Sequence, residues 1–407
     1  MSAYSGFVPI PEKTFVIRLF DTFSKRYRLF PAKSRNKCPE ARSHLKIFIC
    51  GPTVYDYCHV GHARVFLFYD LVARYLRSAG VSVVFVMNIT DIDPKISDRA
   101  KQYGDTPEKF SDKFSLQLYT DLSLLGVTGI SFARVSDYIP MAKKLALELL
   151  KKGAAYSLNG NVYLDTNKIK SFGRMFAISK GRLKNMRLDI APGKRSPADL
   201  LLWNTADLIG YKYNDRILGS GFPTAHLQDL SVIVALFNGT YQLHGGATDL
   251  VYPHHESLLG QLITLTSLKS PVQCWTHVGL LMSEGSKMSN SLGNAIPIRK
   301  ILRRYNRNVI RLYFLSEHYR KAVHFSTSAI ERLEKLDRRI SEIVSVVRMT
   351  ANIAKGDEDP VTMKTFKGHI ENDFDTIGIL KMLTKIAEDG RPSANFLEIL
   401  QILGLDY

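Results

Sequence analysis

The stretch that decides the fold is FICGPTVYDYCHVGHARVFLFYDLVARYLRSAGVSVVFVMNITDIDPK, which covers residues 48 to 95. An apolar run, Leu45–Cys50, leads into a loop that contains glycine and proline. The tetrad HVGH, residues 59 to 62, then opens an amphipathic segment that ends at Gly80, and a second apolar run, Val81–Met87, follows. This order predicts one βαβ unit of a parallel sheet. Its histidine and glycine cluster would lie at a helix N-terminus, where such folds bind phosphate groups.

This stretch resembles the class I aminoacyl-tRNA synthetases, and within them the cysteinyl-tRNA synthetases. HVGH resembles the HIGH motif of the class, and CGPTVYDYCHVGHAR with NITDID is similar to the cysteinyl branch in particular. KMSNS at 287 to 291 resembles the KMSKS loop, and HGGATD at 244 to 249 with PHHE at 253 to 256 resembles the family's HGGGSDL…FPHHE segment. The resemblance covers about residues 14 to 330. It implies an α/β fold with a Rossmann-like doubly wound parallel sheet, an α+β connective insertion and a C-terminal helical domain.

We expect four parts along the chain. Residues 1 to 92 would form the first half of the catalytic domain, 93 to 220 the connective insertion, 221 to 305 the second catalytic half with the KMSKS-like loop, and 306 to 407 a helical domain. Fewer than ninety residues follow the HYR segment at 318 to 320, so no anticodon-binding domain is expected. Apolar runs predict two short strands within residues 14 to 47 and further strands at Ser231–Phe237, Thr240–Leu243 and His277–Met282. Periodicity predicts helices at Pro107–Leu125, Ile139–Gly153 and Ala322–Met349. A hairpin is expected at Ala155–Asp165, followed by a basic loop region.

The composition indicates which kind of partner the protein binds and in which cellular compartment it is expected. Lys plus Arg exceed Asp plus Glu by 55 − 38 = 17 in 407 residues. Such an excess is typical of proteins that bind nucleic acid, although diffuse solubilising charge is the alternative. The basic residues are densest in Lys25–Lys46 and Lys168–Arg195. The four cysteines lack CxxC spacing and no apolar run approaches the length of a membrane span, so we expect a cytoplasmic protein without a disulfide framework.

The resemblance implies ATP and Mg²⁺ as cofactors and places them at the motifs. The catalytic candidates are His59, His62 and Lys287. A lysine that the family carries later in the KMSKS loop is replaced by Asn290, and the loss of such a cationic donor costs about 3 kcal/mol in a transition state. The ATP-binding candidates are Gly51, His59, Gly61, His62, His244, Gly245, Gly246, Asp249, Lys287 and Ser289.

The family's zinc site is altered in this chain. The resemblance carries over two of its four ligands, Cys50 and His254. Asp229 stands at the position of the second cysteine, and Leu258, which cannot coordinate a metal, at that of the glutamate. Two ligands and one carboxylate fall short of a tight tetrahedral site, which argues against bound zinc. The candidates for amino-acid binding are Thr90, Ala225 and His226. Ala225 replaces the family's tryptophan and opens space, so the amino-acid specificity is expected to be altered.

Three functions remain open at this point. The first is a ligase that forms an aminoacyl-adenylate and transfers the acyl group to tRNA. The second is a ligase with a small amine as acceptor, because the short C-terminal part also resembles the mycothiol-pathway ligases in shape. The third is a synthetase relative that has lost turnover and acts as an RNA-binding or regulatory protein. The expected partners are ATP, an amino acid and tRNA or other RNA, without a membrane; the oligomeric state is left open.

Overall fold

The computed structural model describes residues 16–31, 44–169, 171–177, 192–206, 210–283, 285–350, 360–390 and 395–407. Its centre is a five-stranded sheet in the order β11-β10-β3-β4-β5, with every neighbouring pair parallel. The strands are β3 Leu45–Ile49, β4 Val83–Ile89, β5 Ser131–Arg134, β10 Tyr241–Ala247 and β11 Val272–Val278. Because both faces of a parallel sheet are covered by its crossover helices, these strands are mostly buried apolar runs.

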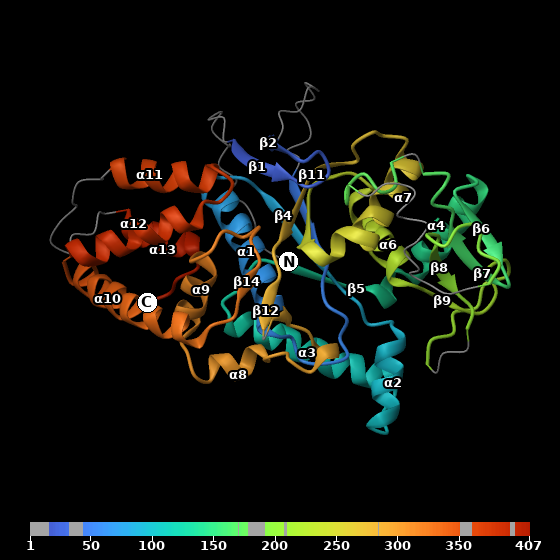
Figure 1. Ribbon diagram of the computed structural model, residues 1–407, viewed down its shortest axis with the longest axis horizontal. Coiled ribbons are helices and arrows are strands. Elements are labelled where there is room, and N and C mark those ends of the chain that lie inside the picture. The colour runs from blue at the N-terminus through green and yellow to red at the C-terminus, as the bar shows by residue number, and fades with distance from the viewer. Residues whose placement is uncertain are drawn as a thin grey trace, which may run out of the picture.

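The predicted βαβ unit is confirmed. Helix α1, Val60–Ser78, connects β3 to β4, and Leu45 lies opposite Val83 at the start of their pairing. Helices cover both faces of the sheet, as Figure 1 shows: α1 lies on the side of the C-terminal helices, and α4, α6 and α7 lie on the other. Each layer has its own apolar cluster of buried residues. The parallel sheet with its flanking helices therefore matches the expected Rossmann-like arrangement.

One predicted strand is wrong. The run expected as the strand Ser231–Phe237 lies inside a helix, α6, Ala225–Phe237, which ends where Asn238 takes a left-handed conformation at φ 53°. A short apolar run fits a buried helix as well as a buried strand, and the structure decides for the helix. The strand expected at Thr240–Leu243 is part of β10, and the strand expected at His277–Met282 is divided between the end of β11 and β12, Leu281–Ser283.

The connective region contributes a helical pair and a second sheet. Helices α3 Pro107–Leu124 and α4 Ile139–Lys151 confirm two expected helices, and α2 Pro94–Gln102 is an additional one. The predicted hairpin is β6 Ala155–Leu158 with β7 Asn161–Leu164. The hairpin joins β8 Leu200–Asn204 and β9 Phe222–Pro223 in an antiparallel sheet. Strand β5 lies between α3 and α4 in sequence but pairs with β4, so part of the expected insertion builds the central sheet. Most of the predicted basic loop, residues 178–191, lies outside the described residues.

The remaining elements lie at the sheet's margins. The two strands expected near the N-terminus are β1 Ile17–Asp21 and β2 Arg26–Phe30, an antiparallel hairpin beside β11. A small sheet contains β12, β13 Ser286–Lys287 and β14 Val323–His324. Helix α7 is Glu256–Thr266, and the chain continues through α8 Ile298–Leu302, α9 Arg307–Leu315, α10 Thr327–Thr350, α11 Pro360–Glu371, α12 Thr376–Asp389 and α13 Phe396–Leu403. Within the described ranges, no helix has the length and apolar character needed to cross a membrane.

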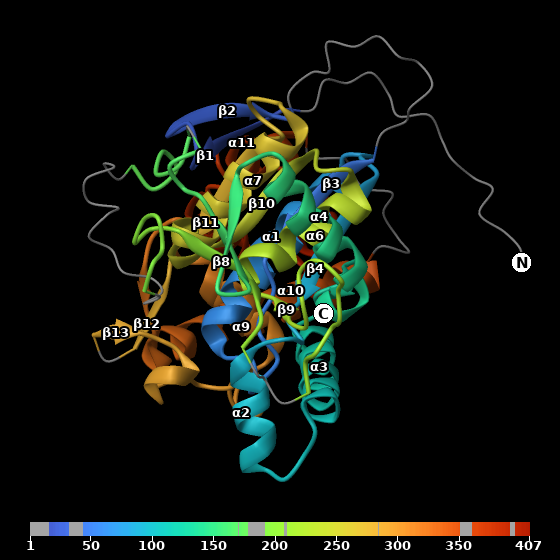
Figure 2. The ribbon, with the colours of Figure 1, turned by 90° about the vertical axis from the view of Figure 1, so that its right-hand side faces the viewer.

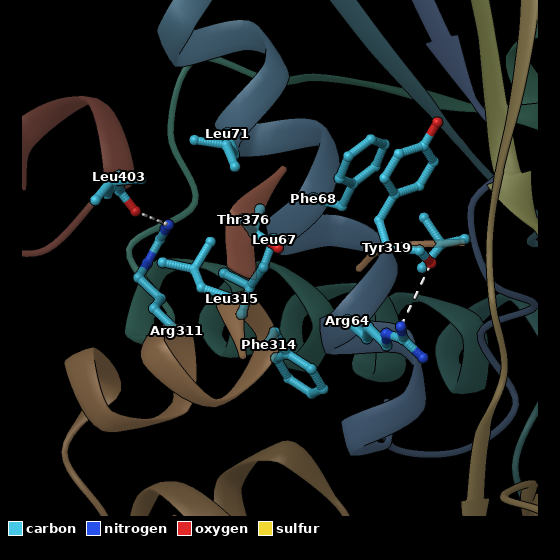
Figure 3. A pocket seen from close by; sticks show the side chains of 11 residues that line it. Arg64, Leu67, Phe68, Leu71, Arg311, Phe314, Leu315, Tyr319, Thr376 and Leu403 are labelled. Atoms are coloured by element: carbon cyan, nitrogen blue, oxygen red, sulfur yellow. Dashed lines mark hydrogen bonds between the residues drawn. The ribbon is translucent and has the colours of Figure 1, made fainter. Parts of the chain in front are cut away.

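Two buried arginines connect α1 to the elements that follow it. Figure 3 shows them beside a cavity of about 30 Å³ that α1, α9 and the end of α13 line. Arg311 on α9 donates to the carbonyl of Leu403 and forms an ion pair with Asp70 on α1, at 2.7 Å. Arg64, near the start of α1, donates to the carbonyls of Gly279 and Tyr319. Because a guanidinium has five donors in a fixed plane, one buried side chain can bind several backbone carbonyls at once, and the histidine end of α1 is thereby held in place.

Candidate functional site

The predicted motifs meet around one cavity of about 290 Å³, where β3 ends and α1 begins. The loop after β3 contributes one wall and the segment around β13 the opposite wall. Among the predicted residues, those that line the cavity are Cys50, Gly51, His59, Gly61, His62, Asp249, Lys287 and Ser289. The carboxyl ends of parallel strands meet at one edge of the sheet, which is where α/β folds usually place their ligands.

The two histidines of the tetrad cap α1 reciprocally. The backbone N–H of His62 donates to His59 Nδ1, the backbone N–H of His59 donates to His62 Nδ1, both at 3.3 Å, and the rings stack with centroids 3.7 Å apart. Burial, reinforced by the charge of Lys287, lowers the pKa of His59 to about 4 and that of His62 well below its usual value. Both rings are therefore neutral near pH 7. Since each Nδ1 accepts a hydrogen bond, the proton is on Nε2, and the pair offers two N–H donors at a helix N-terminus.

Two glycines leave room that a side chain would fill. A Cβ on Gly51 would lie 1.8 Å from the carbonyl oxygen of Asn88, so only glycine lets this loop run against the end of β4. A Cβ on Gly61 would lie 2.9 Å from His59 Nδ1. Gly61 is thus needed for the histidine pair itself, and its closeness to a nucleotide stays a prediction.

The KMSNS segment closes over the cavity through two contacts. Lys287 forms an ion pair with Asp249, which follows β10. Asn290 Nδ2 donates to the carbonyl of Tyr57 at 3.1 Å and connects the segment to the loop before α1. The charges of Lys287 and Asp249, both candidates for ATP binding, therefore neutralise each other here.

The residues at the family's zinc position also come together. His254 Nε2 lies 3.4 Å from Cys50 Sγ and 3.0 Å from Asp229 Oδ2, and the other oxygen of Asp229 accepts from Asn88 Nδ2 at 2.8 Å. In a tetrahedral zinc site, zinc–ligand bonds of about 2.0 to 2.3 Å separate neighbouring donors by about 3.3 to 3.8 Å. His254 lies at this separation from Cys50 and somewhat closer to Asp229, and donor atoms of Cys50, His254 and His255 all lie within 4.8 Å of one another. Leu258 is 1 % exposed and lies in the apolar cluster between the sheet and helices α4, α6 and α7.

Cys50 is not an activated nucleophile. Burial, and secondly the negative charge of Asp229, raise the pKa of the Cys50 thiol well above its usual value, so it stays protonated. In a Cys–His–Asp relay, the thiol and the carboxylate bond to opposite nitrogens of the imidazole. Here both contacts converge on Nε2 of His254, which suits a shared ligand better than a proton relay.

The three candidates for amino-acid binding do not line this cavity. Thr90 is buried, and its backbone pairs with Pro52 and Val54 of the loop after β3. Ala225 is exposed at the start of α6. The ring centroid of His226 lies 5.9 Å from that of His254, and its buried Nδ1 has no hydrogen-bond partner in the described part of the chain. Burial lowers the pKa of His226 to about 3, so the ring is neutral.

The HGG segment is placed differently from the expectation that it binds ATP. His244 is fully buried and bonded on both nitrogens, to Tyr241 Oη at 2.7 Å and to His255 Nε2 at 3.1 Å. A Cβ on Gly245 would lie 2.2 Å from the ring of Tyr69, and one on Gly246 would lie 2.9 Å from the ring of His255. These residues pack against core side chains and do not line the cavity. Of this segment, Asp249 alone among the ATP-binding candidates reaches the cavity wall.

Sequence reasoning missed three residues that shape the site. Asn88 fixes Asp229 and also accepts the backbone N–H of Gly51 at 2.7 Å. Tyr55 and Lys95 line the cavity, with Lys95 Nζ 5.5 Å from the Tyr55 ring centroid. Asn88 and Lys95 lie in the segment NITDIDPK at the end of β4, and Tyr55 lies in the segment GPTVYDY after β3.

Comparisons with known proteins agree with this geometry. The family profile of the class I (C) tRNA synthetase catalytic domain matches residues 37–335. The cysteine–tRNA ligase of Thermococcus onnurineus is 32 % identical over 385 residues, which is 91 % of this chain and 79 % of that protein, and that of Laribacter hongkongensis is 32 % identical over 381 residues, 93 % and 81 %. Among solved structures, Mycobacterium tuberculosis methionyl-tRNA synthetase bound by methionyl-adenylate has a TM-score of 0.64 at 14 % identity, covering 88 % of this chain and 84 % of its own.

Proposed function

The chain belongs to the class I tRNA synthetase family, in its cysteine branch, and on that premise we propose that it is an ATP-dependent ligase that activates an amino acid and transfers it to tRNA. The observation that carries this proposal is the neutral histidine pair at the N-terminus of α1, with Lys287 across the same cavity. This arrangement provides two N–H donors, the partial positive charge of a helix end and one cation.

The chemistry assigned to the cavity is adenylate formation. A carboxylate oxygen of the amino acid attacks the α-phosphorus of ATP, a new P–O bond forms, and the bond to pyrophosphate breaks. His59 and His62 would donate to the triphosphate while its charge shifts to the leaving pyrophosphate, and Lys287 would leave Asp249 to bind the β- and γ-phosphates. Mg²⁺ would enter with ATP and neutralise the same charge.

The amino acid would sit near Cys50, Asp229 and His254. These three donors would hold zinc, which would supply a soft Lewis acid with one open position for a substrate thiolate. The replacement at Leu258 and the exposed Ala225 favour a weaker metal site and an altered specificity. We therefore propose that specificity depends on whether metal is bound, because an apolar pocket alone separates similar side chains by only about 1–3 kcal/mol.

A second candidate is a synthetase relative without turnover. The observations that favour it are Asn290 in place of a lysine and the ion pair that occupies both Lys287 and Asp249. The small-amine acceptor remains a third proposal, which no described contact favours.

Exchange of labelled pyrophosphate into ATP tests the proposal with each of the twenty amino acids, with and without added zinc. We expect exchange with at least one amino acid and its loss in His62→Ala and Lys287→Ala. His44→Ala, at an exposed position before the amino end of β3, and Lys335→Ala, at an exposed position on α10, are matched controls that should keep full exchange. An absence of exchange with every amino acid would favour the second candidate. If exchange is found, a charging assay with total tRNA against small amines would decide between the acceptors.

A further inference from the structure

A second hollow surface lies on the β1–β2 hairpin. It is a groove of about 620 Å³ lined by Phe23, Ser24, Arg26, Tyr27, Arg28 and Arg174. The groove shares no lining residue with the catalytic cavity. Figures 1 and 2 both show the hairpin at the top of the molecule, whereas β12 and β13, which flank the catalytic cavity, lie lower. It is therefore a separate surface, which the site described above does not use.

Two of its three lining arginines have no acidic partner among the described residues. Arg28 is held by structural contacts, an ion pair with Asp21 at 3.1 Å and a hydrogen bond to the carbonyl of Gln273. In contrast, Arg26 and Arg174 form no ion pair with any described residue, and both are exposed. No Asp or Glu lines the groove, and Asp21 is only 1 % exposed. Two guanidiniums thus face solvent in a hollow without a carboxylate.

The surroundings add to this positive charge. Arg18 lies 4.0 Å from the centroid of the Tyr27 ring, and Arg320 lies 5.6 Å from it. Arg320 is held by Asp373, which is buried. Counting the groove's three arginines with Arg18, Arg320 and Lys25 against the buried Asp21, Asp373 and Glu256 leaves a net charge of 6 − 3 = +3. Arginine clusters of this kind bind phosphate through paired N–H donors.

Guanidiniums lie against both aromatic side chains of the groove. Two guanidiniums lie over Tyr27, and Arg174 lies 5.4 Å from the centroid of the Phe23 ring. A single-stranded nucleic acid is usually held by bases that stack on exposed rings. In this groove the guanidiniums lie against the rings instead. Contacts between arginine and phosphate do not distinguish one base from another.

We propose that the groove on the β1–β2 hairpin binds the phosphate backbone of RNA, independently of base sequence, through Arg26 and Arg174. The proposal extends the RNA partner of the proposed function to a surface remote from the catalytic cavity, and it needs no adenylate chemistry. An RNA long enough to use both surfaces would have to span the hairpin and the carboxyl edge of the sheet.

The test compares the salt dependence of RNA binding by the full chain and by an Arg26→Gln/Arg174→Gln double variant. The probe is a labelled RNA hairpin of arbitrary sequence, titrated by fluorescence anisotropy from 50 to 200 mM KCl without ATP. Each phosphate contact contributes about 0.7 to 0.9 to the slope of log affinity against log salt. With two contacts removed, the affinity of the wild type should fall about tenfold more than that of the variant over this fourfold range of salt.

The matched control is Arg332→Gln/Arg338→Gln on α10, which removes the same charge at exposed positions of another face. This variant should keep the wild-type slope. Equal slopes for the wild type and the groove variant would overturn the proposal. Equal losses in the groove and control variants would also overturn it, because they would indicate diffuse charge, and so would a large affinity change with a scrambled RNA sequence.

Pyrophosphate exchange, measured on the same samples, separates this proposal from the proposed function. The groove variant should exchange at the wild-type rate, because neither arginine touches the catalytic cavity. If the wild type shows no exchange but the salt slopes differ as expected, the ligase assignment fails and the RNA surface stands. If exchange is present but the slopes are equal, the reverse holds.

Discussion

Glu256 gives the fold a pH dependence whose size follows from its surroundings. It stands at the start of α7, is 1 % exposed, and accepts the backbone N–H of Phe176 with Oε2 at 3.0 Å, while Oε1 has no partner among the described residues. Burial raises the pKa of Glu256 from its ordinary 4.5 to about 7, although the N–H groups of residues 173 to 176 oppose the rise. The folded protein therefore holds this proton more tightly than the unfolded chain does.

The sign and magnitude follow from linkage. Because the folded pKa is raised, the contribution of Glu256 to stability is fully present below pH 4.5 and is lost as the pH rises through 7. The difference between about 7 and 4.5, at 1.36 kcal/mol per pKa unit, gives a loss of roughly 3 kcal/mol. An unfolding entropy of about 2.1 cal/mol/K per residue over this chain converts that loss into a fall of about 4 °C in Tm.

The perturbation is Glu256→Gln, which removes the titration but keeps an acceptor for Phe176. The amide that the substitution introduces leaves one buried polar group without a partner, which lowers the Tm of the variant by the same amount at every pH. The informative quantity is therefore how the Tm difference between the variant and the wild type changes with pH. From pH 5 to pH 8, which covers most of this loss, the Tm of the variant should rise by about 3 °C relative to that of the wild type in differential scanning calorimetry. Glu388→Gln, at an exposed position on α12, should show no such trend. A difference that is constant across this range, or that grows toward acid, would refute the reasoning.

Three further predictions concern the site. Asn290→Lys should raise pyrophosphate exchange by two to three orders of magnitude, because it returns a cationic donor worth about 3 kcal/mol; an unchanged rate would show that Asn290 lies too far from the reacting phosphates. Gly245→Ala should lower Tm by several degrees, since its Cβ would lie 2.2 Å from the Tyr69 ring, whereas Gly368→Ala, with nothing within 4 Å, should not lower it. Asp229→Ala should reduce the zinc content of protein loaded with zinc and dialysed, measured by mass spectrometry; equal content in the variant and the wild type would exclude Asp229 as a ligand.

The parts of the fold that follow from local pattern could be predicted from the sequence. The βαβ unit was predictable because Leu45–Cys50 and Val81–Met87 are apolar runs separated by one amphipathic helix. The run at Ser231–Phe237 was not, because a buried helix and a buried strand can share the same short apolar pattern. Thr224 and Asn238 mark the ends of that helix, α6, in the structure, but neither is a decisive signal without the tertiary contacts.

The site was predictable in its residue types and less so in their orientation. The structure places His59, His62 and Lys287 of two different motifs at one cavity, and their catalytic role stays a prediction. They could not show that His244 is directed into the core, because alternate residues of a strand point to opposite faces and register decides which face is buried. The pairing of Lys287 with Asp249 joins segments 38 residues apart, so it is visible only in the folded chain.

The contacts of His254 indicate why this chain could keep a site after losing one of its donors. A single imidazole nitrogen has either one proton to donate or one lone pair to share, yet both Cys50 Sγ and Asp229 Oδ2 approach Nε2 of His254. A proton on Nε2 satisfies Asp229 and leaves the Cys50 thiol with a weak contact, whereas a metal at their centre would engage all three donors at once. Asn88 holds Asp229 in place in either case, so the geometry does not depend on the metal. Because Leu258 contributes no donor, Cys50, His254 and Asp229 are the residues that would hold a metal here, and the metal would supply a Lewis acid for a soft ligand such as a thiol.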